Sequence, residues 1–292
     1  MKLSIKTIFL TLMVIVLSFT GCSTQKPCIE CSMSPEQIKE QELNWQNLNY
    51  KMLTLYRQGN LYEAIKVGKD SLKFAKKTFG EDSLKTATSL NNLGELHRLD
   101  KRFGDAELHY KKALVIKEKL LGKEHSEVAL ILNNLASVYF AENRLADAQT
   151  NYEAALRIME KSPKQDVRSL IALVGNLAEL YKNEQRFPDA ETAYKKLLSI
   201  REKSTGKNDF NYAKTLNDLG ALYFLEGKYT QAEPVFQNTL AILESMLGKN
   251  HPDLSIVLEN IAEVYKKTGA GEKAKVFEDR IKNIRTSNHL PG

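Results

Sequence analysis

A nine-residue pattern recurs along the chain at a constant interval of 42 residues. It stands clearly at Ser89 to His97 (SLNNLGELH) and returns four times further along. The central apolar residue of the pattern stays in phase throughout, without insertion or deletion, at Leu93, Leu135, Leu177, Leu219 and Ile261. A fixed period between 20 and 50 residues is typical of solenoid arrays, in which similar units stack on their neighbours. The chain is therefore predicted to be such an array.

Each period reads as two helices joined by a tight turn. Leu90, Leu93 and His97 are spaced i, i+3 and i+7, which places them on one helical face. A turn is expected near positions 100–102, and a second helix follows that ends at Gly122, a residue favoured after the last helical turn. The fold class is thus all-α. His97 is interpreted as a core residue.

One position of the second helix is alanine in all six periods, and this constancy predicts a close approach of two helices. A larger side chain at such a position would overpack the interface, at a cost of about 1–3 kcal/mol. The six residues are Ala64, Ala106, Ala148, Ala190, Ala232 and Ala274.

The pattern resembles the tetratricopeptide repeat. Leu93-Gly94, Ala106 and Tyr110 stand where that repeat has its signature residues. The 42-residue period and the Glu-Lys-x-Leu-Gly-x-x-His ending at His125 resemble the kinesin-light-chain type. The resemblance implies a right-handed α-solenoid of about six stacked units over residues 35–285, with divergent end units and a disordered tail at 286–292.

The N-terminal segment is predicted to be a lipoprotein signal peptide over residues 1–21. Lys2 and Lys6 precede a 12-residue apolar run that is too short to cross a bilayer. The run leads into Gly21-Cys22, which resembles the lipobox of bacterial lipoproteins, although Phe19 replaces the usual Leu. The resemblance implies acylation of Cys22 and a membrane anchor. With Ser23 rather than Asp after the cysteine, it implies a place in the bacterial cell envelope, on the outer membrane facing the periplasm.

Residues 22–34 are read as the acylated cysteine and a flexible tether. Cys28 and Cys31 lie within it and form either a small disulfide or a free pair. The segment lacks the further ligands that a zinc site needs. At Ser34-Pro35 a helix is expected to begin, because serine caps helix N-termini and proline is tolerated at the first helical position.

Little in the sequence indicates catalysis. It contains no nucleophile elbow, no glycine-rich phosphate loop and no histidine pair at metal-ligand spacing. We therefore expect no enzyme activity, no cofactor and no metal. The formal charge of +6 falls to about +4 without Lys2 and Lys6, which is below the usual footprint of a nucleic-acid-binding protein.

Candidate binding residues lie on the first helix of each unit. In tetratricopeptide arrays this helix lines the concave surface, and the resemblance implies that asparagines there contact bound peptides. An amide side chain offers donors and an acceptor to a peptide backbone, but it can equally bond to the neighbouring unit and hold the stack. The acidic-amide set comprises Asn91, Asn92, Asn133, Asn134, Asn176, Asn217 and Asp218.

Cations and aromatic residues alternate further along the same helices, at Arg98, Phe140, Lys182 and Phe224. This mixture favours an acidic or aromatic-bearing segment through ion pairing and cation–π contacts. The expected function is a membrane-anchored scaffold that binds a peptide segment of an envelope protein. A pilotin-like assembly factor for an outer-membrane machine is the alternative. The sequence leaves the oligomeric state open.

Overall fold

In the computed structural model the chain is described over residues 33–162 and 166–287, and this part is built from twelve α-helices. The prediction of an all-α array of about six helix pairs is confirmed. The helices are α1 (Pro35–Arg57), α2 (Leu61–Phe79), α3 (Leu84–Leu99), α4 (Phe103–Leu121), α5 (Ser126–Ala141), α6 (Leu145–Lys161), α7 (Val167–Asn183), α8 (Phe187–Thr205), α9 (Phe210–Leu225), α10 (Tyr229–Leu247), α11 (Leu254–Lys267) and α12 (Gly271–Ser287).

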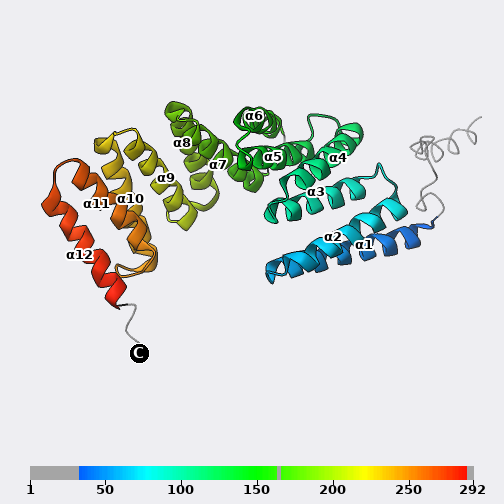
Figure 1. The fold of residues 1–292 in the computed structure, drawn as a ribbon, viewed down its shortest axis with the longest axis horizontal. Helices are drawn as coiled ribbons and strands as arrows, with labels where there is room; N and C mark the ends of the chain where they lie inside the picture. The colour runs from blue at the N-terminus through cyan, green and yellow to red at the C-terminus, as the bar shows by residue number, and fades with distance from the viewer. Residues whose placement is uncertain (1–32, 163–165, 288–292) are drawn as a thin grey trace, which may run out of the picture. The chain divides into compact units, whose positions relative to one another are not determined.

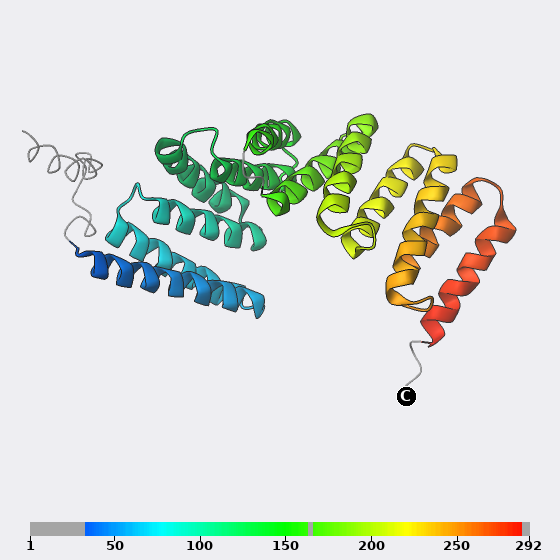
Figure 2. The ribbon, with the colours of Figure 1, turned by 180° about the vertical axis from the view of Figure 1, so that it is seen from behind.

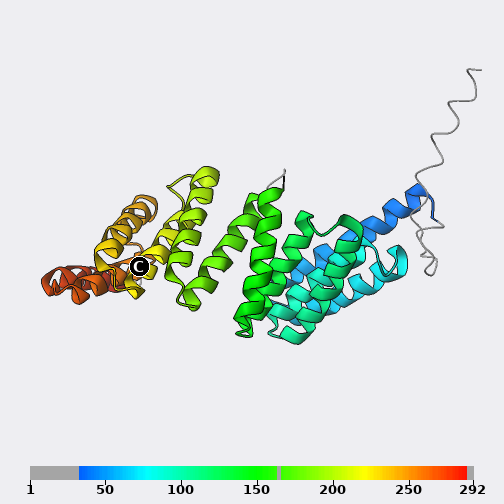
Figure 3. The ribbon, with the colours of Figure 1, turned by 90° about the horizontal axis from the view of Figure 1, so that it is seen from above.

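The helices form two compact units that divide near Leu120, the first with α1 to α4 and the second with α5 to α12. Within each unit, the two helices of a pair lie side by side and run in opposite directions (Figure 1, and from behind in Figure 2). The pairs of the second unit follow one another in chain order (Figure 3). The odd-numbered helix is the first helix of each pair and the even-numbered helix is the second.

The turn within each pair has one residue in the left-handed backbone region, and this residue recurs every 42 positions. It is glycine in three pairs, but Lys101, Asn143 and Gln185 adopt φ values of 58°, 58° and 57° in the others. The next backbone N–H donates to a carbonyl five residues back, as in the 2.8 Å bond from Arg144 to Tyr139. This bond satisfies a carbonyl at the helix end that would otherwise lack a partner. The turn predicted near positions 100–102 is confirmed.

The start of the array follows the sequence signals closely. The Ser34 side chain accepts from the Gln37 backbone N–H, and the Gln37 side chain accepts from the Ser34 N–H, which forms a capping box. Proline at position 35 fits because the first helical N–H has no helical partner. The predicted helix start is therefore confirmed. At the other end, α12 runs to Ser287, two residues past the expected boundary.

The core lies between the helices of each pair. The recurring alanines are fully buried at 0–2% exposure, as the constancy of that position predicts. The aromatic residue four positions later fills the space beside them and is also buried, at Tyr110, Tyr152, Tyr194 and Phe236. Where the first helix passes under this ring, only a small residue fits. At Gly94 an added Cβ would lie 2.9 Å from the ring of Tyr110, and at Gly220 it would lie 2.7 Å from that of Phe236.

Candidate functional site

Within each unit the predicted binding residues lie on the same side of the first helices, here called the first-helix face of that unit. Their side chains are half-buried, so each contacts the array and solvent at once. They lie on α3, α5, α7 and α9. The asparagines and Asp218 come before the buried Leu-Gly or Leu-Ala pair of each helix, and the cations and aromatic residues come after it.

Asparagine side chains on this face bond from one first helix to the next within a unit. The Nδ2 group of Asn92 donates to Oδ1 of Asn49 at 3.0 Å. The same bond joins Asn176 to Asn133 at 3.1 Å and Asn260 to Asn217 at 2.8 Å. In every case the donor stands 43 residues after the acceptor, so the bonds follow the repeat. These amides therefore connect neighbouring pairs, which limits the free groups they offer to a ligand.

The Asn133–Asn176 bond is expected to stabilise the second unit measurably. We expect a double-mutant cycle with Asn133→Ala and Asn176→Ala to give a coupling energy of about 0.5–1.5 kcal/mol, the usual net worth of one intramolecular hydrogen bond. Urea unfolding of the wild type, both single variants and the double variant supplies the four free energies. Additive losses would show that the two amides do not support each other.

The cations of the first-helix face are held in ion pairs. Arg98 donates to both carboxylate oxygens of Glu95, at 2.7 and 2.8 Å, and Lys182 lies 2.5 Å from Glu179. Burial alone would raise the pKa of Glu95, but its bonds with Arg98 and with the Tyr110 hydroxyl lower it. The sequence pattern suggested cations open to an acidic segment. The structure shows each cation already paired with a carboxylate three residues earlier in the chain, so an acidic ligand would compete with that partner.

The aromatic residues of the face are partly engaged as well. The ring of Phe224 meets that of Tyr229 edge-on, with centroids 5.3 Å apart. Both Phe140 and Phe224 remain half-buried, so an edge of each side chain stays accessible. They can supply apolar contact to a ligand without giving up a polar partner.

One position interrupts the series of amide bonds. By the 43-residue register, Asp218 should face residue 175, but that residue is Gly175 and has no side chain to offer. Among the residues that the structure describes, Asp218 has no hydrogen-bond or ion-pair partner. Burial, and then the nearby charge of Glu179, raise the pKa of Asp218. The site therefore holds a half-buried carboxylate without a partner among the described residues.

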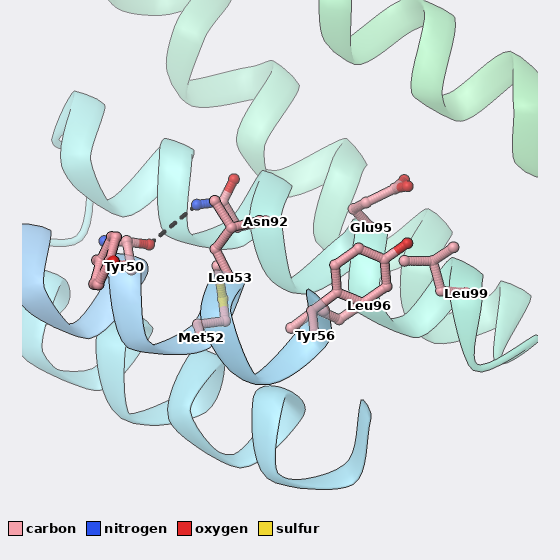
Figure 4. Close-up of a pocket in the computed structure, with 9 residues that line it drawn as sticks. Tyr50, Met52, Leu53, Tyr56, Asn92, Glu95, Leu96 and Leu99 are labelled. Carbon is pink, nitrogen blue, oxygen red and sulfur yellow. Dashed lines mark hydrogen bonds between the residues drawn. The ribbon is translucent and has the colours of Figure 1, made fainter. Parts of the chain in front are cut away.

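A cleft of about 340 Å³ opens between α1 and α3 in the first unit. Figure 4 shows the Asn49–Asn92 bond near Tyr50 at one end of it, with Tyr56 and Leu99 at the other. Met52, Leu53 and Leu96 contribute to its largely apolar lining (Figure 4).

A second cleft, of about 490 Å³, opens between α9 and α11 over α10 in the second unit. It is called the α9–α11 cleft below. Ala213, Leu243 and Val257 give it apolar walls. Lys214, Asn217, Asp218 and Asp253 supply its polar groups, and Phe210 and Ile256 are exposed at its edge. Asp218, which has no partner among the described residues, is thus one of the residues that line this cleft.

His97 is buried at 1% exposure, which agrees with its interpretation as a core residue. Its ring lies 5.2 Å from that of His109, and its Nδ1 atom is buried without a hydrogen-bond partner. Burial, and then the proximity of His109 and Arg102, lower the pKa of His97. Tyrosine holds the equivalent position in the four later units, at residues 139, 181, 223 and 265.

Stability of the first unit should therefore fall in mild acid. Because the pKa of His97 is lower in the folded than in the unfolded chain, the unfolded state takes up the proton first. We expect the free energy of unfolding to be full above about pH 6.5, the ordinary histidine pKa, and to fall as the pH drops below it. Urea unfolding from pH 7.5 to 5 measures this, and His97→Tyr should flatten the profile. An unchanged slope in that variant would assign the pH dependence to other groups.

Two further searches of the described residues bear on chemistry and location. No cluster of three or more His, Cys, Asp or Glu side chains suited to a metal ion occurs within 33–162 and 166–287. In the same ranges, none of the helices combines the length and the apolar character needed to cross a membrane. Cys22, Cys28 and Cys31, like the predicted signal peptide and residues 288–292, lie outside the described residues.

The sequence analysis missed Asn49, which bonds to the predicted residue Asn92, and it missed that Gly175 interrupts the series of amide bonds. Asn49 lies one period before Asn91, so the period itself was the signal that locates it. The register of 43 residues was not visible, because it depends on which side chains of neighbouring helices meet.

Comparisons with known proteins agree with the repeat fold. A family model described as tetratricopeptide repeat matches residues 48–119, 109–161, 168–245 and 212–286. The structure of BtubC (BKLC) from P. vanneervenii is similar with a TM-score of 0.68 and 27% identity, covering 80% of this chain and 94% of that one. A search of curated proteins gives no match.

Two other solved structures share the fold at lower identity. The repeats of a putative kinesin light chain from Podospora anserina align with a TM-score of 0.62 and 17% identity, covering 70% of this chain and 96% of that one. PilW, described as a widely conserved type IV pilus biogenesis factor, aligns with a TM-score of 0.62 and 17% identity, covering 82% of this chain and 92% of that one.

Proposed function

Since the chain belongs to the tetratricopeptide repeat family, a family of protein–protein interaction scaffolds, we propose that it is a membrane-anchored scaffold whose first-helix face binds a peptide segment of an envelope protein. The observation that carries the proposal is the α9–α11 cleft, which joins apolar walls to a carboxylate that has no partner among the described residues. Pockets that bind ligands are mostly apolar with a few placed polar groups, and this cleft has that composition.

The face is suited to an extended or helical segment rather than to a small molecule. Its clefts lie between successive first helices, at α1–α3 in one unit and at α9–α11 in the other. Each is open on one side and has exposed apolar residues at its edge, such as Tyr50 and Ile256. A segment that lies across several first helices can place side chains in such clefts, as ligands of helical grooves do.

Two exposed aliphatic residues allow a matched test of the face. Ile256 on α11 lines the cleft and Val276 lies on α12, and both are 65% exposed. We expect Ile256→Glu to reduce recovery of the partner from envelope extracts by about tenfold or more, because a charge would enter an apolar contact. Val276→Glu should leave recovery unchanged. Equal recovery with both variants would place the binding surface elsewhere.

The membrane anchor rests on the sequence alone. The apolar run and Gly21-Cys22 support a lipid at Cys22, and a multiply acylated N-terminus holds a protein stably on a leaflet. The mass of the mature N-terminus tests this directly. A diacyl or triacyl mass on Cys22 is the expected result, and Cys22→Ala should move the chain to the soluble fraction. An unmodified N-terminus, or membrane retention of the Cys22→Ala chain, would contradict it.

Assembly of an outer-membrane machine is the second candidate. The similarity to PilW is at 17% identity and shows the fold alone, so it does not favour this role by itself. The identity of the recovered partner decides between the two: a secretin or pilus component would favour assembly.

A further inference from the structure

We propose that the α9–α11 cleft takes a lysine or arginine side chain of the bound segment, with Asp218 accepting a hydrogen bond from its charged head. This inference rests on the proposed function, since it assumes that a polypeptide lies on the first-helix face. It adds that one residue of the ligand is basic and that Asp218 recognises it.

The first step is the missing partner of Asp218. Three amide pairs at a 43-residue register connect first helices within the units, and the pair that would include Asp218 lacks one member because residue 175 is glycine. Lys182, Lys214 and Arg201 act on Asp218 only through longer-range attraction and form no ion pair with it. The Asp218 carboxylate is half-buried and has no protein partner, so a donor from a ligand can bind it without displacing another side chain.

The second step is the contrast between Asp218 and three other acidic residues of the second unit's first helices. Glu179 is paired with Lys182 and the Tyr194 hydroxyl. Glu259 pairs with Arg285 at 2.6 Å, and Glu263 pairs with Lys266 at 2.9 Å. Asp218 differs from these three in having no partner among the described residues. A cationic ligand therefore finds its acceptor at Asp218 without displacing an ion pair.

The third step is the shape and charge of the cleft. Lysine and arginine have an apolar stem and a charged head, and they pack the stem on apolar surface while the head finds a polar partner. Ala213, Leu243 and Val257 provide such a surface beside Asp218. The ionisable lining residues are Lys214, Asp218 and Asp253, so with both aspartates ionised the cleft carries one net negative charge. This balance favours a cation over an acidic side chain.

The test begins with selection of random peptides displayed on phage against the full chain. Enriched peptides are expected to share a lysine or arginine at one position. A synthetic peptide from this set should bind the wild type about 10- to 100-fold more tightly than its analogue with methionine at that position, the range expected for a buried hydrogen bond to a charged group.

Variants of two positions then locate the effect. Asp218→Asn should remove most of the preference for the basic residue. Gly175→Asn should do the same, because it restores the amide that the register places opposite Asp218. Gly175→Ala is the matched control and should keep the preference, since its Cβ meets only Leu197 Cδ2, at 3.7 Å.

The outcomes separate this inference from the proposed function. Enrichment of peptides without a basic preference, or a preference that survives Asp218→Asn, would overturn the role of Asp218 and leave peptide binding standing. Failure of the folded wild type to enrich any peptide, together with equal partner recovery from the Ile256→Glu and Val276→Glu chains, would count against the proposed function and this inference alike.

Discussion

Replacing Phe236 with alanine is expected to lower the free energy of unfolding by about 3–5 kcal/mol, the usual cost of removing a buried phenylalanine ring. The ring is 1% exposed and packs against Gly220 between α9 and α10. Its loss would leave a cavity in the core that the second unit shares over α7 to α12. Urea unfolding followed by circular dichroism measures the change.

An exposed aromatic residue provides the control for this prediction. Tyr62 on α2 is 78% exposed, and Tyr62→Ala should change the free energy of unfolding by no more than about 0.5 kcal/mol. Because stability in a repeat array is carried by each unit and its neighbours, the Phe236→Ala chain is expected to lose the second unit first. A loss below about 1 kcal/mol would show that the ring does not fill the core as described.

Alanine substitutions at two helical glycines are expected to have opposite effects. At Gly220 the new Cβ would lie 2.7 Å from a buried ring, so Gly220→Ala should cost about 1–3 kcal/mol. At Gly175 the nearest neighbour is a Leu197 methyl at 3.7 Å, which is ordinary contact. Gly175→Ala should therefore stabilise the second unit by about 0.5–1 kcal/mol, because alanine restricts the unfolded chain and favours helix.

Both variants are measured by the same urea unfolding experiment, and the sign of the difference is the result that matters. In two other pairs the position equivalent to Gly220 is alanine, namely Ala136 in the pair of Tyr152 and Ala178 in the pair of Tyr194. The buried ring therefore fits beside an alanine in those pairs. A shift of the Phe236 ring would therefore reduce the cost at Gly220 toward the low end of the range. Stabilisation at Gly220 would contradict the close approach of α9 to that ring.

The fold was predictable because its signals are local and repeat in phase. The capping box at Ser34, the buried alanines and the turn residues can each be recognised in one helix pair, and the 42-residue period extends them to the others. The left-handed turn position was visible only where it is glycine, as at Gly59. At Lys101, Asn143 and Gln185 the turn imposes a left-handed backbone conformation on residue types that do not predict it.

The candidate site was predictable only as a surface. The sequence placed Asn133 and Asn176 on the same side of their helices but left open whether they hold a ligand or the stack, because that depends on the side chains of the next helix. For the same reason the sequence suggested that Arg98 is a free cation. In the structure Arg98 is paired with Glu95, three residues earlier. That Asp218 lacks an amide partner could be recognised only from the 43-residue register of the amide pairs, which the structure supplies.

Photo-crosslinking in intact cells can show whether the first-helix face holds the protein ligand. A photoreactive amino acid replaces Ile256 on α11 or Val276 on α12, two side chains of equal exposure. The account predicts an adduct with one envelope protein from position 256 that Gly175→Asn weakens, and none from position 276. An adduct from position 276 alone would contradict it.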